Sequence, residues 1–214
     1  GGDDELPTDV AIPDVLPILT LRSSVLFPGS ITPITVGREK SMKLVRDVEQ
    51  MGGLLGAVLQ KESDVEVPGP GDMYRIGTAA KILKILEMPN GNLTVILHGI
   101  EKIEVQEFMS SEPFFRATVT TIKDWTPEKG NVEFEALVDS IRDVALGIIN
   151  ISAGMPKEAV FAIKNIDSRR SLINFICTNM DFSDADRQHL LEAPGLLIRA
   201  RRLLEILIRE QQLA

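Results

Sequence analysis

Residues 16–41 constrain the fold of this chain more than any other segment. Two short apolar runs with an extended pattern, 16–21 and 31–36, are separated by the turn pair Pro28-Gly29. Directly after them, apolar residues recur at the three- and four-residue spacing of a helix: Met42, Leu44, Val45, Val48 and Met51. The segment therefore predicts two strands followed by a helix over residues 38–51.

The extended pattern continues as far as residue 123. Apolar or alternating runs cover residues 54–60, 74–87, 93–99, 100–108 and 114–123. The sequence Pro89-Asn90-Gly91 between the second and third of these runs is a strong hairpin signal. This part of the chain is therefore predicted to be mostly β, with one early helix.

The pattern changes to helical near Asp124-Trp125-Thr126-Pro127. Beyond it, helices are predicted over residues 134–149 and 157–166, then after Asp167 or Ser168, and over residues 184–192 and 196–213. Asp167 or Ser168 is expected to cap the third of these helices, and Ser183 the fourth. The predicted organisation is a disordered acidic tail (1–14), a β domain (15–124) and a helical bundle leading to a linker helix (125–214). The fold class is α+β, with a small, mostly antiparallel, partly closed β domain crossed by one helix.

Charge and composition exclude several kinds of partner. The net charge is −8, and residues 1–14 supply −5 of it, so the body of the chain is close to neutral. No basic stripe is present to neutralise phosphates, and we expect no direct nucleic-acid binding. No apolar run approaches the ~20 residues of a membrane span, and we expect no membrane partner. The single cysteine, Cys177, excludes an internal disulfide.

The first segment resembles the start of the N-terminal domain of Lon-type ATP-dependent proteases. In that family an LP-x-LPLR-x-x-V-x-FPG segment leads to a VGR-x-x-S helix start. This chain carries LPILTLRSSVLFPG and then VGREKS, and it departs only slightly, at Thr20 and at Ser23-Ser24. The later PGPGDMY loop before GTAAKI is also similar to the family pattern. The resemblance extends over about residues 15–214 and is weaker in the helical part.

The resemblance implies a PUA-like β domain and a non-catalytic role in recognising and tethering unfolded or damaged proteins. The partners would be those polypeptides, the rest of the Lon chain and neighbouring Lon subunits, which form a hexamer in the full-length protein. The parent would be an ATP-dependent Ser–Lys endopeptidase whose motor, with its ATP and Mg, lies outside this chain. A bacterial cytoplasm is expected rather than a mitochondrial matrix. The alternatives are a stand-alone Lon-N-type adaptor and a small-ligand-binding module.

The residues themselves predict no catalytic, cofactor or metal site. No G-x-x-x-x-G-K-[ST] phosphate loop occurs, and the nearest look-alike, at residues 37–41, lacks the first glycine and the Gly-Lys pair. His98 and His189 cannot complete a zinc site with one cysteine alone. Cys177 lies in an apolar helical pattern and is expected in the core. The chain is therefore predicted to be a binding module and not an enzyme.

Six large apolar residues at turns or strand ends are the candidate substrate contacts: Leu26, Phe27, Met73, Tyr74, Phe114 and Phe115. One interpretation is that they plug the ends of the β core. The other is that they form an exposed apolar patch, which on a monomer usually marks an interaction site. Periodicity does not separate the two interpretations.

The last predicted helix, over residues 196–213, has an apolar face wider than a narrow coiled-coil seam. Its first half is expected in the core of the bundle. Its end is a candidate assembly surface for a neighbouring subunit, with the residues Leu204, Leu207 and Ile208. No glycine or proline stops the helix after Gly195, so we expect it to continue into a linker and to fray beyond Arg209 in the isolated chain.

Overall fold

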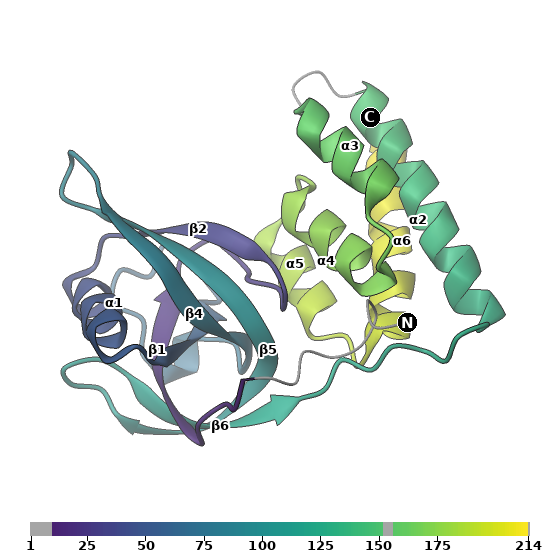
Figure 1. Cartoon of the computed structure of the whole chain (residues 1–214). Coiled ribbons are helices and arrows are strands. Elements are labelled where there is room, and N and C mark those ends of the chain that lie inside the picture. The colour runs from purple at the N-terminus through teal and green to yellow at the C-terminus, as the bar shows by residue number, and fades with distance from the viewer. Residues whose placement is uncertain (1–9, 152–155, 214) are drawn as a thin grey trace. The chain divides into compact units, whose positions relative to one another are not determined.

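The computed structural model describes residues 10–151 and 156–213 (Figure 1). Within them the chain divides into two compact units, one ending at Lys123 and the other beginning at Asp124. The first is built mainly of strands and the second of helices, as the α+β prediction required. Most of the expected acidic tail, residues 1–9, lies outside the described residues. The remainder differs from the expectation, because Ile12 packs against the β core.

The first unit is a small barrel with an added strand and one helix. Among the described residues, five strands pair in a closed ring, β1–β3–β4–β5–β6, and β2 adds to β5. Every pairing in this ring is antiparallel except β1–β3. The elements are, in chain order, β1 (Val15–Leu21), β2 (Ile31–Val36), α1 (Glu39–Met51), β3 (Leu54–Leu59), the short 3-10 turn η2 (Pro70–Asp72), β4 (Ile76–Glu87), β5 (Leu93–Ser110) and β6 (Arg116–Ile122).

Strand β5 differs from the prediction, which divided it into two runs at Gly99. It continues for 18 residues because β4 pairs with it without a break in the strand from Leu93 to Glu104, while β2 pairs with its first part and β6 with its last part. Position 99 requires a glycine because the backbone of Phe27 approaches it closely, and not because the chain turns there. A Cβ at this position would lie 2.3 Å from the Phe27 carbonyl oxygen. The chain between β1 and β2 therefore packs directly on the backbone of β5.

Two apolar clusters make up the core of the β unit. The first joins the buried face of α1, with Leu44, Val45 and Val48, to the ends of several strands. The second lies among β1, β3, β5 and β6. Phe114 belongs to the first cluster and Phe115 to the second.

The second unit contains five helices within its described residues: α2 (Val132–Ile151), α3 (Lys157–Asn165), α4 (Arg169–Asn179), α5 (Asp184–Leu191) and α6 (Leu196–Leu213). The predicted serine caps are present. The Ser168 hydroxyl accepts from the Ser171 amide, and the Ser183 hydroxyl accepts from the Asp186 amide. Capping by side-chain oxygens satisfies amides that the first turn of a helix leaves unpaired.

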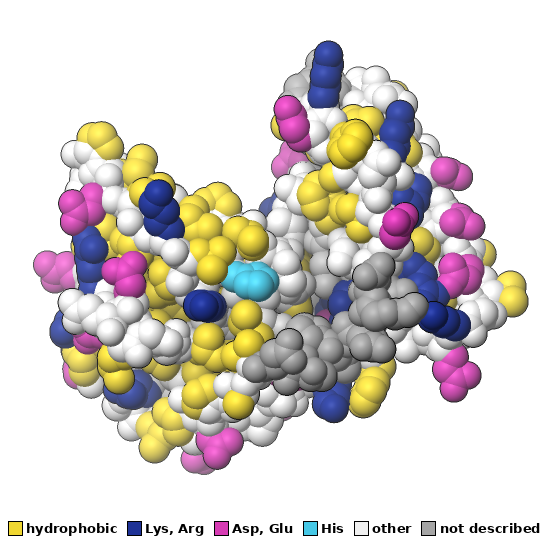
Figure 2. All heavy atoms as spheres, viewed as in Figure 1, with side chains coloured by type: hydrophobic (Ala, Val, Ile, Leu, Met, Phe, Trp, Pro, Cys, Tyr) yellow, Lys and Arg dark blue, Asp and Glu magenta, His cyan; other side chains and the backbone are white. Residues whose placement is uncertain are grey.

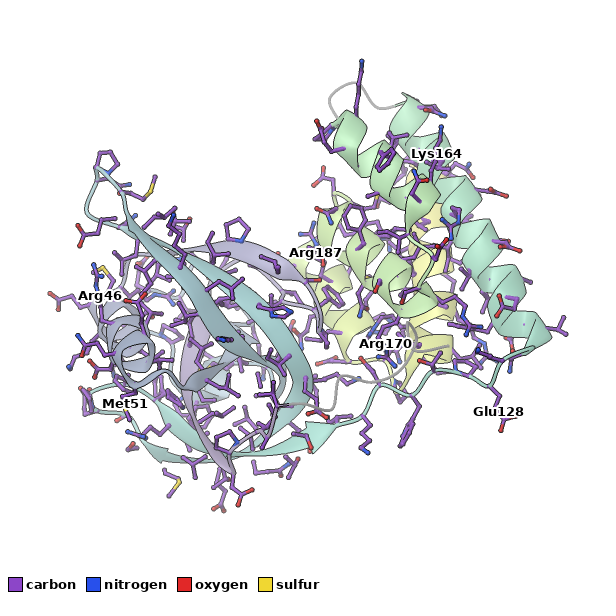
Figure 3. All side chains as sticks on the ribbon, in the orientation of Figure 1. Arg46, Met51, Glu128, Lys164, Arg170 and Arg187 are labelled. Carbon is purple, nitrogen blue, oxygen red and sulfur yellow. The ribbon has the colours of Figure 1, made fainter. Side chains whose placement is uncertain are left out.

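A buried polar network joins the start of this unit to α4 and α6. The fully buried Arg199 of α6 pairs with the Asp124 carboxylate at 2.7 Å and donates to the carbonyls of Leu190 and Leu191. Arg170 of α4 donates to the Asp124 carbonyl and to the Thr126 hydroxyl. Figure 3 labels Arg170 within this unit. Asp124, which the sequence interpretation grouped with the β domain, therefore packs with the helices.

Cys177 lies in the core of the helical unit, as its apolar setting predicted. Burial raises the pKa of the thiol from 9.0 to about 12, because the low-dielectric surroundings disfavour the thiolate. A thiol with this pKa is not a nucleophile near neutral pH.

The raised pKa of Cys177 predicts a loss of stability in alkali. Above about pH 9 the unfolded chain releases the thiol proton while the folded chain keeps it. The unfolded state then binds fewer protons, so the free energy of unfolding falls by roughly 1 kcal/mol per pH unit from this group. Urea titrations at several alkaline pH values measure the slope. The Cys177→Ala variant is the control, because it keeps the other titrating groups; an identical slope in that variant would contradict the assignment.

Candidate functional site

Two adjoining cavities of the β unit lie beside the start of α1. The apolar cavity, of about 300 Å³, has walls formed by Ile18, Leu44, Val67, Pro68, Phe114 and Phe115. The edge cavity, of about 460 Å³, is lined by backbone and side chains of β1 and β2, including residues 19–22 and 34–37. Thr20, Arg38, Ser41 and Glu66 line both cavities, so the two form one continuous site.

Phe115 is one of the two phenylalanines that line the apolar cavity. Its ring packs edge-on against Phe108, with 5.6 Å between the ring centroids. The Lys40 ammonium lies 4.8 Å from the centroid of the Phe115 ring and also pairs with Glu112 at 3.0 Å. The Lys40 ammonium is thus attracted to the aromatic face of Phe115, and both residues line the cavity.

The loop of residues 61–68 forms one rim of the site, and two arginines hold it. Arg22 pairs with the Glu66 carboxylate through both terminal nitrogens, at 3.1 and 3.3 Å. Arg38, just before α1, donates to Gln60 Oε1 at 2.6 Å and to the Val65 carbonyl at 3.2 Å.

These contacts also change the pKa values of the charged groups at the rim. The hydrogen bond from Arg22 lowers the pKa of Glu66, which therefore stays ionised. Burial lowers the pKa of Arg38, since it desolvates the guanidinium, and the nearby charge of Arg22 lowers it further.

The part of the chain that the structure describes shows no group of His, Cys, Asp and Glu arranged to hold a metal ion. In the same residues, no helix is long and apolar enough to cross a membrane. The site itself offers apolar walls and, at its rim, the charge pairs Arg22–Glu66 and Lys40–Glu112.

A family model described as the ATP-dependent protease La (LON) substrate-binding domain matches residues 15–209. The chain belongs to this Lon family. The Lon protease of Flavobacterium johnsoniae is 42% identical over 210 residues, and that of Parabacteroides distasonis is 40% identical over 200 residues. The matches cover 98% and 94% of this chain but only 26% and 24% of those proteins. The chain thus spans about a quarter of the length of these Lon relatives.

Two solved Lon structures share the fold. The N-terminal domain of Mycobacterium avium complex Lon protease superposes with a TM-score of 0.71 at 17% identity, covering 92% of this chain and 98% of that one. A Lon N-terminal domain protein from Xanthomonas campestris gives a TM-score of 0.61 at 19% identity, covering 91% and 97%. The family resemblance seen in the first segment is therefore confirmed, and so is the α+β fold.

The structure brings together two of the six residues predicted to contact substrates in this Lon domain. Phe114 and Phe115 line the apolar cavity although both are largely buried. The exposed-patch alternative does not describe Leu26, Phe27 and Met73, which are buried and line neither cavity.

Hydrogen bonds reach two of these three buried residues. The Thr78 hydroxyl donates to the Leu26 carbonyl at 2.7 Å, and the Thr20 hydroxyl donates to Met73 Sδ at 3.4 Å. Tyr74, the remaining member of the six, is half-buried outside the cavities, and its amide donates to the Leu59 carbonyl.

The three candidate assembly residues on α6 also differ in burial. Leu207 is fully buried and belongs to the core of the helical unit, Leu204 is half-buried, and Ile208 is exposed. The apolar face of α6 is wide because α2, α4 and α5 all pack against it. Of the three, only Ile208 is exposed, and its exposed fraction is 40%.

Sequence reasoning missed Val67, which lies in a segment interpreted as a polar loop. Its side chain is 86% exposed and lies at the mouth of the apolar cavity. An apolar residue flanked by Glu66 and Pro68 carries no periodic signal, so only its position in the fold identifies it.

The end of the β4–β5 hairpin also has exposed apolar residues, namely Leu83, Leu86 and Met88. Figure 2 shows hydrophobic side chains on the surface of this hairpin.

Proposed function

We propose that this chain is the non-catalytic N-terminal part of a Lon-type ATP-dependent protease and that it recognises and tethers unfolded or damaged polypeptides for degradation. The apolar cavity carries this proposal. It opens at the surface, its walls are aliphatic and aromatic, and an exposed Val67 stands at its mouth. Folded proteins bury most of their large apolar side chains, whereas unfolded ones offer them to such a cavity.

The charges at the rim support a receptor with broad sequence tolerance. Arg22 is paired with Glu66, and Lys40 with Glu112, so these four charges neutralise one another at the rim. Contact with apolar side chains alone is weak and accepts many sequences. The remaining parts of the proposal follow the family: the motor and peptidase, with ATP and Mg, reside elsewhere in a cytoplasmic, hexameric Lon protein, and neighbouring Lon subunits are partners of this chain.

The test is binding of a fluorescently labelled unfolded protein, casein, to the 214-residue chain, followed by fluorescence anisotropy. We expect the Val67→Asp variant to bind casein about tenfold more weakly, because a carboxylate replaces apolar surface at the mouth of the cavity. Since Val67 is exposed, the substitution leaves the core unchanged.

Met51→Asp is the matched control for this experiment. Met51 is 81% exposed on α1 but does not line the cavity, so its substitution is expected to leave casein affinity unchanged. An equal loss in both variants would mean that casein binds the apolar surface in general. A parent chain that binds no casein would contradict the proposed function and favour the small-ligand alternative.

A further inference from the structure

Strand β1 has a neighbour on its β6 side along only part of its length. The β1–β6 ladder runs from Val15 paired with Thr118 to Pro17 paired with Arg116. One further bond follows, from the Ile18 amide to the Phe115 carbonyl at 2.8 Å. Beyond this point the chain before β6 bends at residues 112–114. Among the described residues, no strand pairs with the second half of β1 on this side.

The backbone of Thr20 points to this open side. The Ile18 amide bonds toward β6, whereas the Leu21 carbonyl accepts from the Gln60 amide at 2.9 Å on the β3 side. Successive residues of a strand direct their backbone groups to opposite edges, so Thr20 shares the direction of Ile18. Thr20 also lines both cavities. Its N–H and C=O therefore form a short, open strand edge at the floor of the site.

The facing wall of the edge cavity is a second strand edge. Strand β2 pairs only with β5 within the described chain. The Ser30 carbonyl accepts from the Gly99 amide at 2.9 Å, and the alternation that follows turns the backbone of Pro33 and Thr35 to the free edge. Pro33 lacks an N–H and occurs mainly on such edges. Thr35 lines the cavity.

We propose that the site binds an unfolded polypeptide as an extended strand that pairs with β1 at Thr20. The bound strand would lie on the β6 side of β1, just beyond the point where the pairing with β6 ends. This inference rests on the proposed function and adds the conformation of the bound segment. Alternate side chains of the strand point into the apolar cavity beside Phe115, and the others point away from it. The occupant is a polypeptide because an open strand edge is complementary to a second backbone.

Strand pairing accounts for recognition without a sequence motif. The backbone groups that Thr20 can bond are the same in every polypeptide, whereas a helix or a paired strand has already used them. Binding would thus select for unfolded backbone through β1 and for apolar side chains through the cavity.

The experiment uses a ten-residue peptide in which valine and threonine alternate around one phenylalanine, with single N-methyl groups placed at successive positions. N-methylation removes a backbone donor but leaves the side chains unchanged. We expect methylation at a position that faces β1 to weaken binding about five- to tenfold, which corresponds to one hydrogen bond. Methylation of the next residue, whose amide points away, is the matched control and is expected to change affinity less than twofold.

Amide hydrogen exchange of the chain provides the second measurement. The Thr20 amide is expected to exchange rapidly in the free protein and slowly with the peptide bound. A peptide that binds with no dependence on N-methyl position and without Thr20 protection would overturn strand pairing and leave the proposed function intact. Failure of both casein and the peptide to bind would overturn the proposed function itself. Thr20 protection that grows with protein concentration alone would assign the edge to a second copy of the chain.

Discussion

The Asp124→Ala variant is expected to lose about 3–5 kcal/mol of the free energy of unfolding of the helical unit. Arg199 has no solvent exposure and pairs with the Asp124 carboxylate at 2.7 Å. Removing the carboxylate takes this charged partner from a buried guanidinium, which also donates to neutral acceptors: the carbonyls of Leu190 and Leu191 and the Asn174 amide oxygen. Urea denaturation followed by far-ultraviolet circular dichroism measures the loss.

Two further variants separate the charge effect from loss of packing. Arg201 lies on the same helix and pairs with Glu133 at 2.6 Å, but both side chains are about half exposed. The Glu133→Ala variant is therefore expected to unfold close to the parent midpoint, because water screens such pairs. The double variant Asp124→Leu with Arg199→Met is expected to recover part of the loss, since it leaves no unpaired charge. An unchanged midpoint in Asp124→Ala would show that Arg199 is solvated in solution.

The Gly99→Ala variant is expected to destabilise the β unit by about 3 kcal/mol or more. The added Cβ would lie 2.3 Å from the Phe27 carbonyl oxygen and 3.1 Å from the carbonyl carbon. The backbone cannot move aside easily, because the Gly99 amide donates to the Ser30 carbonyl and the Gly99 carbonyl accepts from the Gly29 amide. Scanning calorimetry of the parent and variant measures the change.

Gly53→Ala is the control for this prediction. A Cβ at Gly53 would meet no atom within 4 Å, so the substitution is expected to leave the stability of the β unit within about 1 kcal/mol of the parent. Equal transition temperatures for Gly99→Ala and Gly53→Ala would contradict the close packing of residues 27–29 on β5.

Local chemistry explains which elements were predictable. The helix expected over residues 196–213 agrees with α6 at both ends, and the serine caps of α4 and α5 are those predicted. These features depend on residues within one or two turns of each other, so a linear pattern contains them. The strand boundary predicted at Gly99 was wrong for the same reason. The need for glycine there comes from Phe27, which is distant in sequence.

The candidate site was predictable only in part. Large apolar residues at strand ends can either plug a core or bind a partner, and their spacing is the same in both cases. Phe27 is fully buried, while Phe115 keeps some exposure at a cavity. The difference arises from what packs above each side chain. The cavity assembles β1, α1, the loop of residues 61–68 and the chain before β6, and no short-range pattern reports such a combination.

The sequence by itself determined the family, the order of strands and helices and the absence of a nucleotide-binding loop, because turn residues, caps and apolar periodicity act over short distances. The tertiary structure alone decided the buried pair of Asp124 with Arg199, the exposure of Val67 and the open edge of β1 at Thr20. Each of these depends on which segments meet in space. Burial, pairing of charges and completion of a hydrogen-bond ladder are properties of contacts between distant residues, and they exist only once the chain has folded.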